Sequence, residues 1–187
     1  MQEYHEFIAE VLIPEERLQA RIQELGQEIS RDFAGEKVLL ICILRGGVMF
    51  MTDLMRQISI PTAIEFMAVS SYGVGRRATS GEVRITLDLN TSIENRNVIL
   101  VEDIIDSGHT IAAVLDMLSV RRPKTLSVCT LLDKAERREV EVPVRYCGFV
   151  IANKFVFGYG LDIDDYYRNL PFIGVVDLNK YRPDPKA

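Results

Sequence analysis

The sequence has few features of a disulfide-bonded, zinc-binding or membrane protein. Its three cysteines, Cys42, Cys129 and Cys147, are odd in number and widely spaced. This pattern is typical of core cysteines and not of a disulfide framework or a zinc site. No apolar stretch approaches membrane-spanning length, and the first residues lack the basic and apolar regions of a secretory signal. We therefore expect a cytoplasmic protein that does not associate with a membrane.

Basic charge and the common phosphate-binding motifs are also missing. The chain has a formal net charge of −5, which argues against broad affinity for nucleic acids. It contains no Walker A sequence and no nucleophile elbow. Residues Gly73 to Ala78 have the letters of a dinucleotide fingerprint, but an alternating, strand-like segment follows them instead of a helix. We therefore reject a dinucleotide site there.

Short apolar runs alternate with amphipathic segments, and this predicts one α/β domain spanning residues 1–187. A helix is predicted between Pro14 and Gly35, because apolar residues recur every three or four positions from Leu18 to Phe33. Further helices are predicted at 48–58 and 111–118. The predicted strands are 38–44, 62–69, 82–87, 98–103, 125–132, 144–151, 155–157 and 173–178. Such alternation indicates a mainly parallel sheet flanked by helices.

The stretch Ser70–Ser80 contains glycine, serine and arginine and has no apolar periodicity. This composition predicts a mobile loop, and Ser71 and Tyr72 lie at its start. We expect the loop to fold over a bound substrate and exclude water.

The stretch from Val98 to Thr110 reads as a buried strand, a loop and the start of a helix. Glu102 and Asp103 lie where the strand ends, which is the edge of a parallel sheet at which ligands bind. Adjacent carboxylates suit the vicinal hydroxyls of a sugar. Ser107 and Gly108 allow backbone N–H groups to converge on an anion at the start of the next helix. The stretch therefore predicts a ribose-5-phosphate site, although Asp106 or Ser107 taken alone is equally typical of a simple N-cap.

Four other segments carry polar groups of the same kind. In Leu44-Arg45-Gly46-Gly47, the glycines let the backbone approach an anion such as pyrophosphate, and Arg45 adds positive charge. Lys134 follows a strand and is able to donate to a carbonyl oxygen. Phe155 is able to stack on a flat base, and Asp162 is able to hold a hard metal ion. Taken singly, each also fits an ordinary structural role: a tight turn, a solvated lysine, a core aromatic or a surface ion pair with Arg168.

The order of these segments along the chain resembles that of a known enzyme family. Val98–Thr110 resembles the phosphoribosyl-diphosphate (PRPP) signature of the type I phosphoribosyltransferases, and the segments from Leu44 to Arg168 resemble the hypoxanthine-guanine phosphoribosyltransferases. The similarity covers about two thirds of the chain. It implies a type I phosphoribosyltransferase fold, in which a mainly parallel central sheet is flanked by helices and carries a small hood subdomain and a mobile loop.

The resemblance also implies a role for each residue. Asp106 is the implied acid or base at N7 of a purine. Ribose and 5′-phosphate binding is implied for Glu102, Asp103, Asp106, Ser107, Gly108, His109 and Thr110. Pyrophosphate binding is implied for Leu44, Arg45, Gly46, Gly47 and Arg168, with a Leu44–Arg45 peptide bond that is often cis. Base binding is implied for Lys134, Phe155, Val156, Leu161 and Asp162, and Mg²⁺ binding for Glu102, Asp103 and Asp162.

The implied reaction is Mg²⁺-dependent transfer of ribose 5-phosphate from PRPP to N9 of a 6-oxopurine base. Its products are IMP or GMP and pyrophosphate, and the implied assembly is a homodimer or homotetramer without nucleic acid. Two departures, Asn153 and Ile163, replace an aspartate and an aromatic residue that the family usually has. They leave open a transferase that prefers xanthine or another base. A non-catalytic regulator with the same PRPP pocket is a second alternative, but such a protein is expected to lose Lys134, Phe155 or Asp162 or to carry a basic face.

Overall fold

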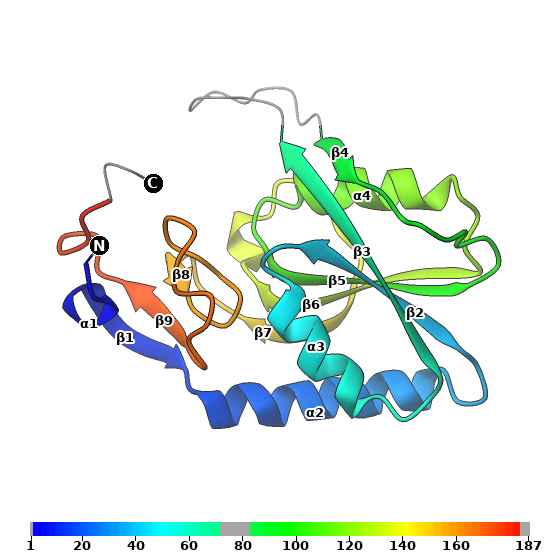
Figure 1. The fold of residues 1–187 in the computed structure, drawn as a ribbon, viewed down its shortest axis with the longest axis horizontal. Coiled ribbons are helices and arrows are strands. Elements are labelled where there is room, and N and C mark those ends of the chain that lie inside the picture. The colour runs from blue at the N-terminus through cyan, green and yellow to red at the C-terminus, as the bar shows by residue number, and fades with distance from the viewer. Residues whose placement is uncertain (1, 72–82, 184–187) are drawn as a thin grey trace.

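The computed structural model describes residues 2–71 and 83–183, arranged as a large six-stranded sheet and a small three-stranded sheet (Figure 1). The order of the large sheet is β4-β3-β2-β5-β6-β7, and every neighbouring pair is parallel except β3 and β4. The mainly parallel sheet is therefore as predicted. Its strands are β2 (Val38–Leu44), β3 (Thr62–Ser71), β4 (Val83–Leu87), β5 (Asn97–Ile105), β6 (Thr125–Asp133) and β7 (Val144–Val150).

Helices cover both faces of the large sheet because its central strands are apolar on both sides. Along β2, Leu40 and Cys42 belong to the core cluster beneath α2 (Glu15–Asp32) and α3 (Val48–Gln57). The alternate residues Leu39 and Ile41 pack in the cluster beneath α4 (His109–Ser119). Successive side chains of a strand point to opposite faces, so a continuous apolar run joins both layers. Figure 1 shows α4 on the side of the sheet opposite α2 and α3.

The small sheet has the order β1-β9-β8 and forms the predicted hood. Its strands are β1 (Ile8–Ile13), β8 (Val156–Phe157) and β9 (Ile173–Val176), and α1 (Tyr4–Phe7) precedes them. Phe7 packs against Phe157, Tyr167 and Tyr181, with ring centroids 5.1–5.6 Å apart. The hood also contacts the large sheet's layer, because the Tyr159 hydroxyl donates to Asp53 of α3 at 2.5 Å.

Several predicted boundaries differ from the structure. The elements α1 and β1 were not predicted. Ile8–Ile13 is mostly apolar but has no regular alternation, and it forms a strand by pairing with the distant β9. Ser70 and Ser71 belong to β3 and pair with β4, so the loop does not begin at Ser70. Phe155 precedes β8, and β9 ends at Val176. The amide of the next residue, Asp177, donates to the carbonyl oxygen of Phe7 at 2.7 Å.

Tyr72 and the rest of the predicted mobile loop, including the Gly73–Ala78 motif, lie outside the described residues. The hairpin pairing of residues 83–87 with β3 is as predicted. None of the helices in the described part of the chain has both the length and the apolar character needed to cross a membrane.

Candidate active site

The predicted site residues meet where β2, β5 and β6 end. These strands are neighbours and run parallel, so the loop after β2, the end of β5 and the residue after β6 share one edge of the sheet. The structure thereby brings Arg45, Asp103, Asp106 and Lys134 from three distant parts of the sequence to one region. The hood loop around Gly160 closes the same region from the other side, because a Cβ atom at Gly160 would lie 2.2 Å from the Gly46 carbonyl oxygen.

The residues with carboxylates at the end of β5 are half-buried, and Oε2 of Glu102 has almost no contact with solvent. Oε2 of Glu102 has no hydrogen-bond partner among the described residues. Burial raises the pKa of Glu102 well above its usual value, and the neighbouring Asp103 raises it further. Burial also raises the pKa of Asp103 to about 6. A buried carboxylate without a partner is costly unless a ligand supplies a hydrogen bond or a positive charge.

Glycine allows the loop after β2 to reach these carboxylates. A Cβ atom at Gly46 would lie 1.7 Å from Oδ2 of Asp103, so any other residue at this position would displace the Asp103 carboxylate. The Leu44–Arg45 peptide bond just before it is cis, as the family resemblance implied.

The loop between β5 and α4 has the form of an anion cradle. Glu102, Asp106, Ser107, Gly108 and Thr110 line a pocket of about 140 Å³. Gly108 adopts a left-handed φ of 94° immediately before α4, and no side chain caps that helix. The free backbone N–H groups at the start of the helix are therefore available to an anion. The ring of His109, the first residue of α4, lies 3.0 Å from Glu139.

Asp106 lies between two basic side chains. Its Oδ2 accepts from Nζ of Lys134 at 3.2 Å, and its Oδ1 accepts from Nε of Arg137 at 2.9 Å. Partial burial acts to raise the pKa of Asp106, but the hydrogen bonds and charges of Arg137 and Lys134 outweigh burial and lower it. Lys134 itself is only 7% exposed. Asp106 is consequently an ionised acceptor held beside a buried donor.

The segment after β6 is hydrogen-bonded to the backbone of the cradle. Arg138 donates to Asp133 at 2.5 Å and to the carbonyl oxygen of Asp106 at 3.1 Å. The amides of Glu139 and Val140 both donate to the carbonyl oxygen of Ser107. These bonds fix the backbone of the loop that carries Asp106, so the position of its carboxylate depends on residues after β6.

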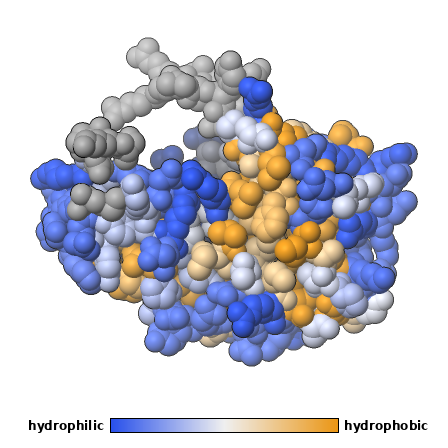
Figure 2. All heavy atoms as spheres, in the orientation of Figure 1, coloured by the Kyte–Doolittle hydropathy of each residue, from blue (hydrophilic) through white to orange (hydrophobic). Residues whose placement is uncertain are grey.

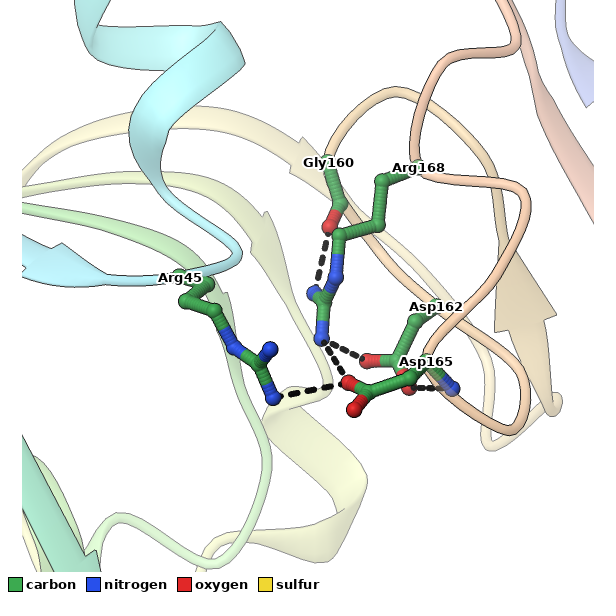
Figure 3. A network of polar contacts seen from close by, with 5 residues as sticks. All are labelled: Arg45, Gly160, Asp162, Asp165 and Arg168. Atoms are coloured by element: carbon green, nitrogen blue, oxygen red, sulfur yellow. Dashed lines mark hydrogen bonds and ion pairs between the residues drawn. The ribbon is translucent and has the colours of Figure 1, made fainter. Parts of the chain in front are cut away.

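The hood contributes a cluster of charged side chains, Asp162, Asp165 and Arg168, which faces Arg45 (Figure 3). Arg168 donates to the Gly160 carbonyl oxygen at 2.7 Å and pairs with Asp162 at 2.7 Å and with Asp165 at 3.2 Å. Arg45 reaches across from the loop after β2 and pairs with Asp165 at 2.8 Å. Arg168 and Asp162 are also close enough to Asp103 to influence its pKa.

The remaining predicted residues lie on the hood side. Phe155 is 47% exposed, which leaves its ring accessible. Val156 and Leu161 are buried and belong to the core cluster beneath α2 and α3. Ser71 ends β3, and its side chain is not described.

The comparisons with known proteins agree on one family. A model of the phosphoribosyl transferase domain matches residues 14–164. The hypoxanthine phosphoribosyltransferase of Salmonella typhimurium is 48% identical over 171 residues, covering 90% of this chain and 96% of that enzyme. The chain belongs to the hypoxanthine phosphoribosyltransferase family. The enzyme of that name from Haemophilus influenzae is 47% identical over 183 residues, covering 96% of this chain and 100% of that enzyme.

Solved structures of the hypoxanthine phosphoribosyltransferase family share the fold. A crystal structure of the Staphylococcus aureus hypoxanthine phosphoribosyltransferase matches with a TM-score of 0.91 at 41% identity, covering 96% of this chain and 97% of that one. A Bacillus anthracis hypoxanthine-guanine phosphoribosyltransferase matches with a TM-score of 0.84 at 44% identity, covering 90% and 98%. The predicted fold and enzyme class are thereby confirmed, and the chain is a phosphoribosyl-transferring enzyme.

Three charged residues of the candidate site, Arg137, Arg138 and Asp165, were not predicted from the sequence. Arg137 and Arg138 belong to the run Glu136–Glu139, which has the composition of a solvated face. Asp165 lies in a run of acidic residues after Asp162, and only the fold brings it to Arg45. The position of Arg137 three residues after Lys134 was the one available signal.

No cluster of three or more histidine, cysteine, aspartate or glutamate side chains in residues 2–71 and 83–183 is arranged to hold a metal ion by itself. Mg²⁺ is often held by one or two carboxylates together with substrate phosphates and water. A site that depends on the substrate therefore fits the carboxylates at the end of β5.

Proposed function

We propose that the protein transfers ribose 5-phosphate from PRPP to N9 of hypoxanthine, and also of guanine, giving IMP or GMP and pyrophosphate in purine salvage. The observation that carries this proposal is the pairing of Lys134 and Asp106, 3.2 Å apart, beside the anion cradle. On a 6-oxopurine, the O6 acceptor and the N7 proton are neighbours on one edge. Lys134 is a donor only and ionised Asp106 is an acceptor only, so together they match that edge.

The position of Asp106 also supports its role as the base. When PRPP reacts, the bond between C1 and the pyrophosphate oxygen breaks and a bond from N9 to C1 forms with inversion. Asp106 accepts the N7 proton as N9 becomes nucleophilic. Its lowered pKa keeps the carboxylate ionised, so that it can accept a hydrogen bond from the N7 N–H group. No covalent intermediate is needed.

The other half of the substrate fits the rest of the site. The cradle from Ser107 to Thr110, helped by His109, receives the 5′-phosphate, and Glu102 and Asp103 receive the ribose hydroxyls. Arg45, Arg168 and the backbone of Leu44–Gly47 receive the pyrophosphate as negative charge develops on it. Phe155 stacks on the base, while Val156 and Leu161 shape its pocket. We also propose a lid role for the predicted mobile stretch that contains Tyr72 and follows Ser71, the last residue of β3.

The buried carboxylates also suit a magnesium ion. Oε2 of Glu102 lacks a partner among the described residues and is therefore an acceptor for a cation or a sugar hydroxyl. The raised pKa values of Glu102 and Asp103 show that nearby positive charge does not offset their burial. Asp162, which faces Arg168, is the third proposed ligand. When bound, Mg²⁺ would neutralise charge on the leaving pyrophosphate. We also propose the cytoplasm as the compartment, because highly charged PRPP does not cross membranes unaided.

The test is to incubate the protein with PRPP, Mg²⁺ and hypoxanthine, guanine, xanthine or adenine in separate reactions and to follow nucleotide and pyrophosphate. We expect IMP and GMP, with hypoxanthine favoured. Formation of XMP as the main product would instead support the xanthine alternative, to which Asn153 and Ile163 point. Absence of any nucleotide would contradict the proposed reaction.

We further propose that two copies pair through the face formed by β3 and α3. Figure 2 shows apolar side chains gathered over these elements. Ile64 is 40% exposed and Met49 is 38% exposed, with the half-buried Phe66 between the sheet and α3. Exposed apolar patches of this kind mark interfaces, and a second copy is the occupant that the predicted homodimer or homotetramer requires.

A further inference from the structure

Asp165 occupies a tight turn that fixes its direction. The amide of Ile163 donates to Tyr166 at 3.2 Å, and the amide of Tyr166 donates back to Ile163 at 3.0 Å. The two residues between them, Asp164 and Asp165, have φ values of 51° and 68°. This is the pattern of a two-residue turn with both central residues left-handed, which aspartate and asparagine tolerate better than most residues.

The carboxylate of Asp165 bridges the two sides of the site. Its Oδ1 accepts from Nη2 of Arg45 at 2.8 Å and from Nη2 of Arg168 at 3.2 Å. Figure 3 shows the two guanidinium groups converging on this carboxylate, one from the loop after β2 and one from the hood. The side chains of Arg45 and Asp165 are 68% and 57% exposed, so both are free to change partners.

We propose that Asp165 is an internal competitor of the pyrophosphate group. In the structure, one carboxylate oxygen takes hydrogen bonds from the two arginines that the proposed function assigns to pyrophosphate, and this inference rests on that assignment. Bound pyrophosphate requires the same N–H donors and carries the same sign of charge. Asp165 must therefore yield these donors when pyrophosphate binds, and it regains them when pyrophosphate leaves.

The two arginines differ in what they keep when Asp165 yields. Arg168 retains the Gly160 carbonyl oxygen and Asp162, each at 2.7 Å. The guanidinium group of Arg45 has Asp165 as its one hydrogen-bond partner within the described part of the chain. Arg168 is thus a fixed half of the pyrophosphate site, and Arg45 is the half that Asp165 controls. The carboxylate specifically weakens pyrophosphate binding and favours its release.

The experiment compares Asp165→Asn with Asp164→Asn, measuring the Kd of pyrophosphate with Mg²⁺ by calorimetry on the full chain. Asparagine keeps the turn, because it also tolerates left-handed φ, and removes only the charge. Asp165→Asn should tighten pyrophosphate binding by ~3- to 10-fold, the scale expected for one exposed charge at close range, and less so at high salt. Asp164→Asn removes the same charge one residue away from the arginines and should stay within about twofold of the parent.

A double-mutant cycle separates competition for Arg45 from a general effect of charge. In an Arg45→Gln background, Asp165→Asn should tighten pyrophosphate binding much less than it does in the parent protein. The proposal would be overturned if both asparagine variants tightened pyrophosphate binding equally, or if Asp165→Asn had its full effect in the Arg45→Gln background. Either result would show a general effect of charge. Unchanged or weaker binding by Asp165→Asn would overturn it too. If the parent forms nucleotide and binds pyrophosphate, such results concern Asp165 alone; if the parent does neither, the proposed function fails as well.

Discussion

At the scale of single residues, Asp106 is the group whose chemistry depends most directly on its neighbours. Lys134 and Arg137 keep its carboxylate ionised. Asp106→Asn preserves the shape of the side chain but cannot accept the N7 proton, so kcat should fall by ~10²-fold or more while the KM for PRPP stays within a few fold. Steady-state kinetics with hypoxanthine measure this.

The matched control is Asp116→Asn, which makes the same change at an exposed position of α4. It should leave both constants unchanged. An equal loss of PRPP binding in Asp106→Asn would make Asp106 a structural part of the phosphate loop and not the base.

Lys134 is the residue that we expect to determine which purine base is used. Its buried ammonium group satisfies the 6-oxo group of hypoxanthine or guanine but would face the 6-amino donors of adenine. Discrimination against adenine should therefore approach ~10⁴-fold in kcat/KM, since the wrong base leaves a buried donor unpaired. Lys134→Ala should reduce turnover of hypoxanthine far more than PRPP binding and should narrow the gap to adenine. A wild-type protein that used adenine as readily as hypoxanthine would show that Lys134 does not face the 6-position.

At the scale of elements, the cradle before α4 depends on Gly108. Its φ of 94° disfavours any side chain, and a Cβ atom would lie 2.7 Å from the Val140 carbonyl oxygen. Gly108→Ala should displace the loop from the segment after β6 and weaken PRPP binding by ~10-fold or more, a loss of about 1.4 kcal/mol. Gly35→Ala is the control, because Gly35 has a φ of 79° but nothing within 4 Å of its Cβ position.

Both alanine variants carry the strain of a left-handed backbone, about 1 to 2 kcal/mol. Gly35→Ala should lower Tm by several degrees and leave the KM for PRPP unchanged. A similar KM in both variants would mean that contact with Val140 does not set the geometry of the cradle.

The sequence predicted those elements whose formation depends on their own residues and not on distant partners. The strands β2, β5 and β6 are buried on both faces, so their apolar runs identify them without knowledge of their neighbours. In contrast, β1 has exposed residues at three successive positions and forms only because β9 pairs with it. No local pattern encodes such a pairing, and β1 was missed for that reason.

The same distinction holds for the candidate site. Glu102 to Thr110 is one continuous segment, and its composition alone predicts a sugar-phosphate pocket; the structure contains a pocket lined by residues of this segment. The ion pair of Arg45 with Asp165 joins residues 120 positions apart. Arg138 supports Asp106 from a different strand connection. Contacts of this kind arise only when the sheet brings its loops together, so the residues that hold and modulate the site could not be read from the sequence.

At the scale of the whole molecule, the apolar face of β3 and α3 is the contact that we propose between two copies of the chain. The large sheet buries its core under helices, yet Ile64 on β3 remains 40% exposed beside α3. A charge there would have to be desolvated in a paired state. Ile64→Arg should therefore shift the protein to a smaller species, with a change in monomer Tm of only a few degrees because the side chain is already part-exposed.

Light scattering coupled to gel filtration measures the shift, and Val120→Arg is the control. Val120 is 78% exposed at the end of α4, on the other layer of the molecule, so the same substitution there places a charge in water and not in the proposed interface. The mass of Val120→Arg should equal that of the parent at every concentration, whereas Ile64→Arg should dissociate at concentrations at which the parent stays paired. If Ile64→Arg folded and kept the parent mass, or if both variants dissociated alike, the face of β3 and α3 would not be the contact between copies.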